Sequence, residues 1–274
     1  MTPDEYCKDK VRRHGSSLHY ALLFLSPDQR RAATAVHAFS RELGEVAFEC
    51  SDPLVAHAKL AWWRQEIAAL YQGSAHHPIG CALQSAVETY RLPEASFQEI
   101  IDGEEADLAR NRYPDFEALS QFCQRKAGVV GQLCAEIFGY HDSKSPEAAR
   151  ELGLVLQLSR IIRDVGIDAR RNRIYLPMDD MAQFQVRPTD LLHRKNPDAV
   201  ARLIDFEIER AQRCFAQALS ELPAVDRRSQ RPHRILAAIH RVLLDEIRVD
   251  GYRVLDCRTS LTPLRKLWIA WRTV

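Results

Sequence analysis

The sequence predicts an all-α protein that folds as a single domain over residues 1–274. Long segments carry apolar residues at every third or fourth position, which is the pattern of amphipathic helices. The 11 glycines and 13 prolines are few for 274 residues, and they gather at the breaks between these segments. No run of alternating β-branched residues with hairpin turns occurs, and no repeat or low-complexity linker divides the chain. We therefore expect helices packed around one core.

Composition narrows the functional classes. The formal net charge is +1, so we expect no nucleic-acid partner. No apolar run approaches the roughly 18–20 residues that cross a membrane, and the polar N-terminal stretch has no signal-peptide core. The seven cysteines are scattered, odd in number and without Cys-x-x-Cys spacing, which favours reduced thiols. A cytoplasmic protein is the expectation that follows.

Helix signals divide the first half of the chain. Ser26, Pro27 and Asp28 form a helix start, with Ser26 as the cap and Pro27 in the first turn. A later segment contains the acidic run from Asp102 to Asp107, for which two interpretations stay open: a solvated face or a side turned inward. The helices expected here cover residues 2–25 in two pieces, 26–49, 54–71, 78–90, 95–110 and 116–140.

The second half is expected to continue with helices over 145–168, from 188 onward, over 197–222 and over 235–252. The final stretch, residues 261–272, mixes tryptophan and leucine with arginine and lysine. That composition suits a helix that lies at a membrane interface, and it equally suits a terminal helix docked on the core. Both interpretations stay open at this point.

A concentrated charge motif lies between Gln157 and Pro177. Asp164 and Asp168 are four residues apart, so a helix places both carboxylates on one face. Paired aspartates of this kind hold hard cations such as Mg²⁺, usually together with phosphate oxygens. The neighbouring arginines match phosphate geometry, but they could equally pair with the aspartates at a solvated helix end. These arginines are Arg163, Arg170, Arg171 and Arg173.

This segment, with the pattern Arg-Asp-x-x-x-Asp followed by Arg-Ile-Tyr-Leu-Pro, resembles the second aspartate-rich signature of the squalene/phytoene synthase family. Further similar stretches run along nearly the full chain, and the subgroup they resemble is that of bacterial presqualene diphosphate synthases. The stretches are Ser16-Ser17, Leu25-Ser26-Pro27-Asp28-Gln29-Arg30-Arg31, Lys59-Leu60-Ala61-Trp62-Trp63-Arg64, Ala127-Gly128-Val129-Val130-Gly131 and Tyr252-Arg253-Val254-Leu255.

The resemblance implies an isoprenoid-synthase helical bundle around a central apolar cleft. It also implies Mg²⁺ as a cofactor and the head-to-head condensation of two farnesyl diphosphates to presqualene diphosphate or squalene. Asp164 and Asp168 would be metal ligands and catalytic residues together with Tyr175. The residues that would bind the substrate diphosphate are Gln157, Arg41, Arg163, Arg170, Arg171 and Arg173.

Four residues depart from the family pattern at positions where it carries chemistry. The first aspartate-rich motif would place its acids at Gly44 and Phe48, neither of which has a metal-binding side chain. Phe122 stands where the family has tyrosine, and Arg160 where it has asparagine. Such a long cation near Asp164 could replace a missing metal charge or bind diphosphate directly.

An acidic pair survives beside the altered motif, at Glu45 and Glu49, but it is displaced by one residue. One residue turns a helical side chain by roughly 100°, so the pair should point outward as solvated glutamates, with ligation of metal as the weaker alternative. The departures favour a family member that binds an isoprenoid diphosphate with impaired or altered catalysis. A non-catalytic binder, or an assembly or partner protein, is the alternative.

Overall fold

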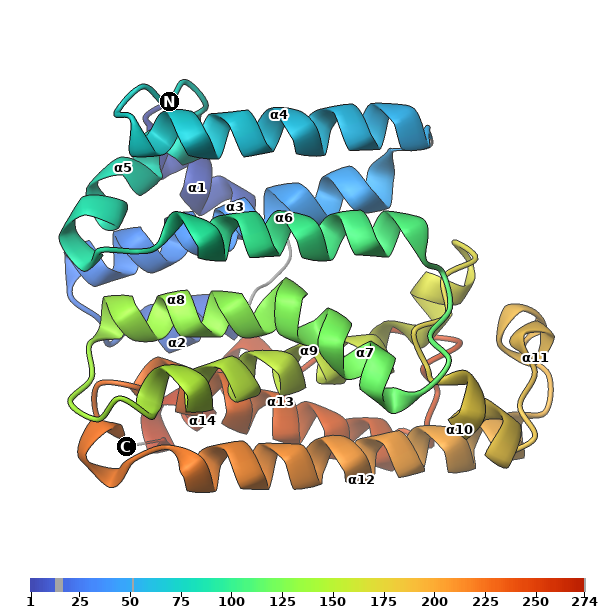
Figure 1. The fold of residues 1–274 in the computed structure, drawn as a ribbon. Helices are drawn as coiled ribbons and strands as arrows, with labels where there is room; N and C mark the ends of the chain where they lie inside the picture. Colours follow the sequence, from blue (N-terminus) through green and yellow to red (C-terminus); the bar gives the residue numbers. More distant parts are fainter. Residues whose placement is uncertain (13–16, 51, 274) are drawn as a thin grey trace.

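The computed structural model describes residues 1–12, 17–50 and 52–273, with the side chains of residues 47–49 left aside. The predictions for Phe48 and Glu49 therefore lie outside the described side chains. The all-α prediction is confirmed, because the described ranges contain helices and no strand beyond one isolated bridge between Arg112 and Ile174. Helix α4 and helix α12 lie at opposite edges of the molecule, with the other long helices between them (Figure 1).

The helix bounds agree with those expected to within a few residues at most ends. The first half contains α1 (Pro3–Arg12), α2 (Ser17–Leu22), α3 (Pro27–Glu49), α4 (Pro53–Tyr71), α5 (Pro78–Tyr90) and α6 (Glu94–Ala109). The middle contains α7 (Phe116–Cys123), the π-helical turn η1 (Gln124–Gly128), α8 (Val129–Phe138) and α9 (Ser145–Ala169). The rest contains α10 (Met178–Gln183), α11 (Pro188–His193), α12 (Pro197–Glu221), the short η2 (Ala224–Asp226), α13 (Arg231–Val249) and α14 (Pro263–Arg272).

Local sequence explains where α3 starts. The Ser26 hydroxyl accepts a hydrogen bond from the backbone N–H of Gln29, and the Gln29 side chain accepts one from the Ser26 backbone N–H, which forms a capping box. Pro27 occupies the first turn, where its missing N–H costs nothing. The start of α3 at this point was predicted from these residues.

Helix α9 is the central element of the fold. It contacts η1, α7, α8, α11, α12 and α13, and Figure 1 shows it surrounded by neighbouring helices. The buried apolar residues form two clusters, one mainly on α3 to α8 and one mainly on α9 to α13, and Leu156 of α9 packs against both. A long apolar face on one helix therefore joins the two halves of the core.

The helix expected over 116–140 has an interruption. It consists of α7, the π-helical η1 and α8, and the π-helical turn widens the backbone between Gln124 and Gly128. Gly153 of α9 lies directly against the backbone of Ala127 and Gly128, where an added Cβ would overlap with main-chain atoms. This close approach brings the side chains of η1 next to those of α9.

The C-terminal helix α14 is docked on the bundle and exposed at the same time. Ile269 and Ala270 are buried against α13 and α2. The opposite face exposes Leu264, Trp268 and Trp271. No helix in the described ranges combines the length and the apolar character that a bilayer crossing requires.

Candidate functional site

The aspartate pair lies on one side of α9, as the spacing predicted, and turns toward the interior. The side chain of Asp164 is 19% exposed, and Asp168 is 8% exposed. Gly166 lies between them, and its N–H donates to the carbonyl of Val254 at 3.2 Å. An added Cβ at Gly166 would come 2.6 Å from that carbonyl oxygen, so only glycine lets the segment after α13 approach α9 here.

Asp164 is held by two arginines. Arg163 donates to its carboxylate from Nε at 2.8 Å and from Nη2 at 2.5 Å, and Arg258 donates from Nε at 2.8 Å. Burial alone would raise the pKa of Asp164, but the hydrogen bonds and charges of the two arginines outweigh burial and lower it to about 2. Asp164 is therefore ionised at neutral pH, and its oxygens are already engaged.

Asp168 has a different environment. Within the described part of the chain, no hydrogen bond or ion pair reaches its carboxylate, although its backbone carbonyl accepts from the N–H groups of Arg171 and Arg173. Burial raises the pKa of Asp168 to about 7, and repulsion from the Asp164 carboxylate adds to this. Two carboxylates four residues apart thus differ strongly in acidity, because burial dominates at Asp168 whereas the contacts of Arg163 and Arg258 outweigh burial at Asp164.

Five cations gather around Asp164, which we call the basic cluster: Arg41, Arg160, Arg163, Arg258 and Lys266. Burial lowers the pKa of Arg160, and the charges of Arg163, Arg41 and Arg258 lower it further. The pKa of Lys266 is lowered by burial and then by Arg163 and Arg258. These mutual effects place the cluster members within range of one another's charges.

Arg160 is an exposed residue of α9 whose charge reaches groups on α3. Its side chain is exposed to solvent, yet burial among protein atoms is the largest influence on its pKa. Burial and then the Arg160 charge lower the pKa of His37 on α3 to about 4. The charge of Arg160 on α9 therefore acts on α3 as well.

The opposite side of the site is acidic, and its carboxylates form ion pairs with a lysine and an arginine. Lys126 of η1 donates to Glu104 Oε2 at 2.9 Å and lies 3.6 Å from Asp107 Oδ2. Arg173 Nη1 lies 3.1 Å from Asp107 Oδ1, and the Tyr175 hydroxyl donates to the Asp107 carboxylate at 3.0 Å. The acidic run over 102–107 therefore turns part of its charge inward, which resolves the two interpretations left open by the sequence.

Gly44 lies across from this acidic side. A Cβ added at Gly44 would meet Glu104 Oε1 at 3.7 Å. That oxygen is buried and has no hydrogen-bond partner among the described residues, while Glu104 itself is fully buried. The glycine of the altered first motif thus lies next to a carboxylate oxygen that has no hydrogen-bond partner among the described residues.

Phe122 keeps the aromatic ring at the position where the family pattern has tyrosine. It stacks on Tyr175 with ring centroids 5.6 Å apart and lies 5.2 Å from the ring of Tyr113. The Lys126 ammonium lies 5.3 Å from the Phe122 centroid, within the range of a cation–π contact. These three rings form an aromatic floor under the ion pairs.

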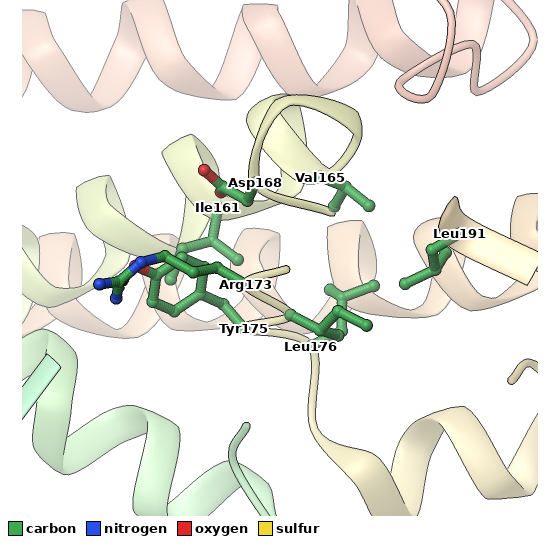
Figure 2. A pocket seen from close by; sticks show the side chains of 8 residues that line it. Ile161, Val165, Asp168, Arg173, Tyr175, Leu176 and Leu191 are labelled. Atoms are coloured by element: carbon green, nitrogen blue, oxygen red, sulfur yellow. Dashed lines mark hydrogen bonds between the residues drawn. The ribbon is translucent and has the colours of Figure 1, made fainter. Parts of the chain in front are cut away.

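A small cavity opens beside Asp168, lined by that carboxylate, by Arg173 and Tyr175, and by apolar side chains that include Ile161 and Leu191. Figure 2 shows Asp168 near the end of α9, with Arg173, Tyr175 and Leu176 on the segment that follows. The cavity measures about 10 Å³, which corresponds to about one water molecule.

The remaining predicted site residues differ in burial and in their hydrogen-bond partners. Gln157 is buried on α9, and its Oε1 has no hydrogen-bond partner in the described ranges. Arg170 and Arg171 are exposed at the end of α9, where Arg170 donates to the carbonyl of Leu255 at 3.5 Å. Arg41 is in the basic cluster, and it donates to the carbonyl of Val11 at 3.2 Å.

Glu45 is engaged by cations of α1 and α3. It forms ion pairs with Lys10 and, at 3.6 Å, with Arg41, and its side chain is 30% exposed. This agrees with the rotation of roughly 100° that one residue introduces along a helix. The weaker alternative, in which Glu45 ligates a metal opposite Asp164, has no support from its position.

Several site residues could not be identified from the sequence. Glu104, Lys126, Arg258, Lys266 and His37 reach the site from four helices and one connecting segment. The sequence carries one weak signal: Lys126 is a lysine directly before the small and apolar run that begins at Ala127. The others lie among ordinary charged residues of amphipathic helices.

The side chains as arranged do not fit a bound Mg²⁺. Asp164 is paired with two arginines, while Glu104 and Asp107 are paired with Lys126 and Arg173. The described ranges hold no group of three or more histidine, cysteine, aspartate or glutamate side chains arranged around a metal position. A divalent ion would have to displace arginine or lysine contacts to reach these carboxylates.

Comparisons with known proteins agree with this fold. A family model described as squalene/phytoene synthase matches residues 11–265. A phytoene synthase from Mycobacterium tuberculosis (strain ATCC 25618 / H37Rv) is 32% identical over 263 residues, which cover 95% of this chain and 86% of that protein. Two solved structures are also similar. Squalene synthase HpnC from Alicyclobacillus acidocaldarius has a TM-score of 0.80 and 28% identity, and the match covers 91% of this chain and 94% of that chain.

The second structure supports the fold alone. A dehydrosqualene synthase solved in complex with a ligand has a TM-score of 0.89 at 22% identity, and the match covers 99% of this chain and 95% of that chain. The sequence match extends over nearly the whole chain, from α1 to α14, and includes both sides of the site. The chain therefore belongs to the squalene/phytoene synthase family.

Proposed function

We propose that this protein binds an isoprenoid diphosphate of the farnesyl type, with the diphosphate on the basic cluster. The observation that carries this proposal is the convergence of five cations around Asp164, whose carboxylate is contacted by Arg163 and Arg258. Burial lowers the pKa of Arg160 and of Lys266, and a diphosphate would relieve the repulsion from neighbouring cations that lowers them further. Arginine forks match its oxygens with paired hydrogen bonds.

The isoprenoid chain would lie against the aromatic floor and the apolar face of α9. Phe122, Tyr175, Ile161 and Val165 supply apolar surface beside the cavity at Asp168. The cavity volume of about 10 Å³ is far below the roughly 300 Å³ or more of ordinary ligand pockets. Binding therefore requires the packed side chains to separate along this face.

We propose that head-to-head condensation, the reaction of the family, is impaired or altered in this member. Gly44 supplies no carboxylate, Phe122 supplies no hydroxyl, and Arg160 adds a positive charge near Asp164. Arginine and lysine would carry the charge that a divalent ion contributes elsewhere, so Mg²⁺ should add little to ligand affinity. The alternative is a non-catalytic binder that works as an assembly or partner protein.

A calorimetric titration tests the binding step. The wild-type protein should bind a non-hydrolysable farnesyl diphosphate analogue saturably, with affinities in Mg²⁺ and in EDTA that differ by less than about threefold. Arg258→Gln should weaken binding about tenfold, or about 1.4 kcal/mol, because one charge-assisted contact is lost. Arg213→Gln, which changes an exposed arginine on α12, is the matched control. Absence of saturable binding in both buffers contradicts the proposal.

An activity assay separates the two catalytic alternatives. Incubation with farnesyl diphosphate and Mg²⁺, followed by extraction and chromatography, should yield no presqualene diphosphate or squalene above a no-enzyme control. Formation of either product, abolished by Asp164→Ala, would show that the family reaction survives. Saturable binding of the farnesyl diphosphate analogue without formation of either product would favour the alternative of a non-catalytic binder.

The exposed face of α14 supports a second proposal, peripheral contact with a lipid surface at the cytoplasmic side of a membrane. Leu264, Leu267, Trp268 and Trp271 recur at helical spacing and are 78%, 43%, 54% and 68% exposed. Tryptophan flanked by basic residues is typical of interfacial helices. Arg272 lies over the Trp268 ring, with 4.6 Å between guanidinium and centroid.

Vesicle flotation tests the lipid contact. Vesicles that contain anionic lipid should carry the wild-type protein upward, whereas Trp268→Ser/Trp271→Ser should remain at the bottom of the gradient. Leu192→Ser, at an exposed leucine on α11, is the control for loss of apolar surface. Wild-type protein that stays unbound, or that self-associates through α14 in analytical ultracentrifugation, would assign this face to a protein contact instead.

A further inference from the structure

A second cavity lies apart from the basic cluster, between α3, α4 and the start of α5, where α4 forms one edge of the molecule (Figure 1). It measures about 200 Å³. We call it the aromatic pocket, and among the described residues its lining consists of three aromatic rings, two opposite charges and one valine: Trp62, Trp63, His77, Glu42, Lys59 and Val46. Glu42 precedes Gly44 by two residues, which turns its side chain roughly 200° away around α3. The aromatic pocket is therefore on the opposite face of α3 from the site described above.

The three rings of the aromatic pocket stand nearly at right angles to one another. The interplanar angle is 78° between Trp62 and Trp63, 74° between Trp62 and His77, and 68° between Trp63 and His77, with ring centroids 4.6–5.9 Å apart. Such planes form a corner, so a flat ligand could stack on only one of them, whereas a compact group touches several. The face of an aromatic ring is electronegative, and the compact group that suits this corner is therefore a cation.

Contacts with the rest of the fold hold the corner in place. Trp63 is 3% exposed, and its ring centroid lies 5.5 Å from that of Phe39 in the core. His77 caps the N-terminus of α5, where its Nδ1 accepts a hydrogen bond from the N–H of Ile79 at 3.1 Å. Burial lowers the pKa of His77 below its usual value of about 6.5, so the ring is neutral at neutral pH and does not repel a cation. Trp62 is 44% exposed, which leaves the corner accessible from solvent.

Two opposite charges complete the lining. Glu42 forms an ion pair with Lys10 of α1 at 2.5 Å, which holds its carboxylate beside the rings. Lys59 is exposed, and its ammonium group donates to Sγ of Cys50 at 3.5 Å. A ligand with a positive charge alone would be attracted by Glu42 and repelled by Lys59. A ligand that carries both charges gains from both side chains.

We propose that the aromatic pocket binds a small zwitterion that carries an alkylated ammonium group and an anionic group. The ammonium group would occupy the corner of Trp62, Trp63 and His77, beside Glu42, and the anionic group would contact Lys59. Methyl groups on the nitrogen match the apolar ring faces, as in other aromatic cages for such ligands. The volume of about 200 Å³ is below the roughly 300 Å³ of pockets for larger ligands, so the zwitterion should be of amino-acid size. No residue of this lining belongs to the basic cluster.

Tryptophan fluorescence tests the binding directly. The variant Trp268→Ser/Trp271→Ser keeps Trp62 and Trp63 as its only tryptophans, so its emission reports on the pocket. Glycine betaine should change this emission saturably, and choline should do so with lower affinity. The uncharged isostere of choline, 3,3-dimethyl-1-butanol, should bind about tenfold more weakly than choline, because it has the same shape without the charge.

Substitutions, compared by calorimetry, separate recognition from loss of structure. Trp62→Leu should weaken binding of glycine betaine about fivefold, whereas Trp62→Tyr should restore most of it, because tyrosine keeps an aromatic face. Lys59→Met should weaken glycine betaine about threefold and tighten choline, since it removes both the partner of the anion and the repulsion of the cation. A merely structural change would weaken both ligands. Lys195→Met, at an exposed lysine after α11, should change neither affinity.

A free solute and a lipid headgroup can both supply this chemistry. Phosphatidylcholine vesicles that change the emission as glycine betaine does would identify a headgroup as the source, and a response to the solute alone would identify a free small molecule. Equal affinity for choline and its uncharged isostere, or no saturable response to any probe, would overturn the proposal. Neither result affects the diphosphate proposal, because these titrations contain no isoprenoid.

Discussion

At the scale of single residues, the two aspartates of the signature have opposite electrostatic roles. Asp164 stabilises the fold because Arg163 and Arg258 surround its charge. Asp168 is buried at 8% exposure, and no ion pair reaches its carboxylate from the described residues, so its ionised form costs free energy. Identical residues on one helix face thus differ because their tertiary neighbours differ.

Substitution with asparagine should separate these roles. Asp164→Asn should lower the free energy of unfolding by about 1–3 kcal/mol, because it leaves arginines facing one another without their anion. Asp168→Asn should raise it by about 1–3 kcal/mol at pH 8. The folded-state pKa of about 7 lies above the unfolded value of about 3.9, so ionisation opposes folding at this pH.

Urea denaturation at pH 8 measures both changes. Equal losses of stability in the two variants would contradict the assignment, since that result would mean that Asp168 has an unrecognised charged partner. The same pair should differ in anion binding: Asp164→Asn frees the arginines and should tighten binding of the diphosphate analogue.

At the scale of elements, close backbone contacts on α9 fix the geometry of the site. Gly166 allows Val254 and Leu255 to approach α9, and the segment they begin carries Arg258 to Asp164. Gly153 makes the equivalent contact with η1, the element that carries Lys126. The basic side and the acidic side of the site therefore each depend on a glycine of α9, because a larger residue there would prevent the close backbone contact.

Two glycine-to-alanine substitutions test the role of close backbone contact, because we expect them to change the stability of the protein in opposite directions. Gly166→Ala should destabilise the protein by about 1–3 kcal/mol, because its Cβ would lie 2.6 Å from the Val254 carbonyl oxygen. Gly44→Ala lies in a helix interior where the nearest atom is 3.7 Å away, so it should stabilise by about 0.5–1 kcal/mol. Thermal denaturation of the two variants and of the wild-type protein measures both changes in stability.

Ligand affinity adds a readout that stability alone does not give. Gly166→Ala should weaken binding of the diphosphate analogue as strongly as Arg258→Gln does, since it displaces the segment that positions Arg258. A Gly166→Ala variant with full stability and full affinity would show that the two segments can separate without loss.

At the scale of the whole molecule, the site is a charged layer between the two apolar clusters of the core. Cations from α3, α9, α14 and the segment before α14 meet on one side, and acids from α6 on the other. Buried histidines lie in the same layer. His240 of α13 is 7% exposed, and its Nδ1 is 2.9 Å from the Ser159 hydroxyl.

Acid should therefore unfold this protein through its histidines. Burial lowers the pKa of His240 to about 3, and Arg163, Arg160 and Lys266 contribute. The unfolded value is about 6.5, so the contribution of neutral His240 to stability is complete above pH 6.5 and decreases as the pH falls toward 3. Between pH 7.5 and pH 5 this amounts to about 2 kcal/mol for one histidine.

Guanidinium denaturation across that range measures the dependence. His240→Gln should be less stable than the wild type at pH 7.5, and it should lose about 2 kcal/mol less on going to pH 5. A variant whose pH profile is parallel to that of the wild type would place the titration elsewhere, for example at His233 or His37, whose pKa values are also lowered by burial.

The sequence by itself determined the all-α class, most helix bounds, the start of α3 at Ser26 and the shared face of Asp164 and Asp168. These features follow from local periodicity and capping, which act over one to three helical turns. The motif pattern also led to the family, which the match over residues 11–265 establishes. Its single domain and the roles of its site residues stay predictions.

Only the tertiary structure decided which charges meet. Arg258 reaches Asp164 across 94 positions of sequence, and Lys126 reaches Glu104 across 22. Arg170 and Arg171, adjacent to the motif, turn outward because α9 ends at Ala169. Ion pairs between helices depend on the packing of their apolar faces and on where glycine permits close approach, and neither is encoded in the spacing of the charged residues themselves.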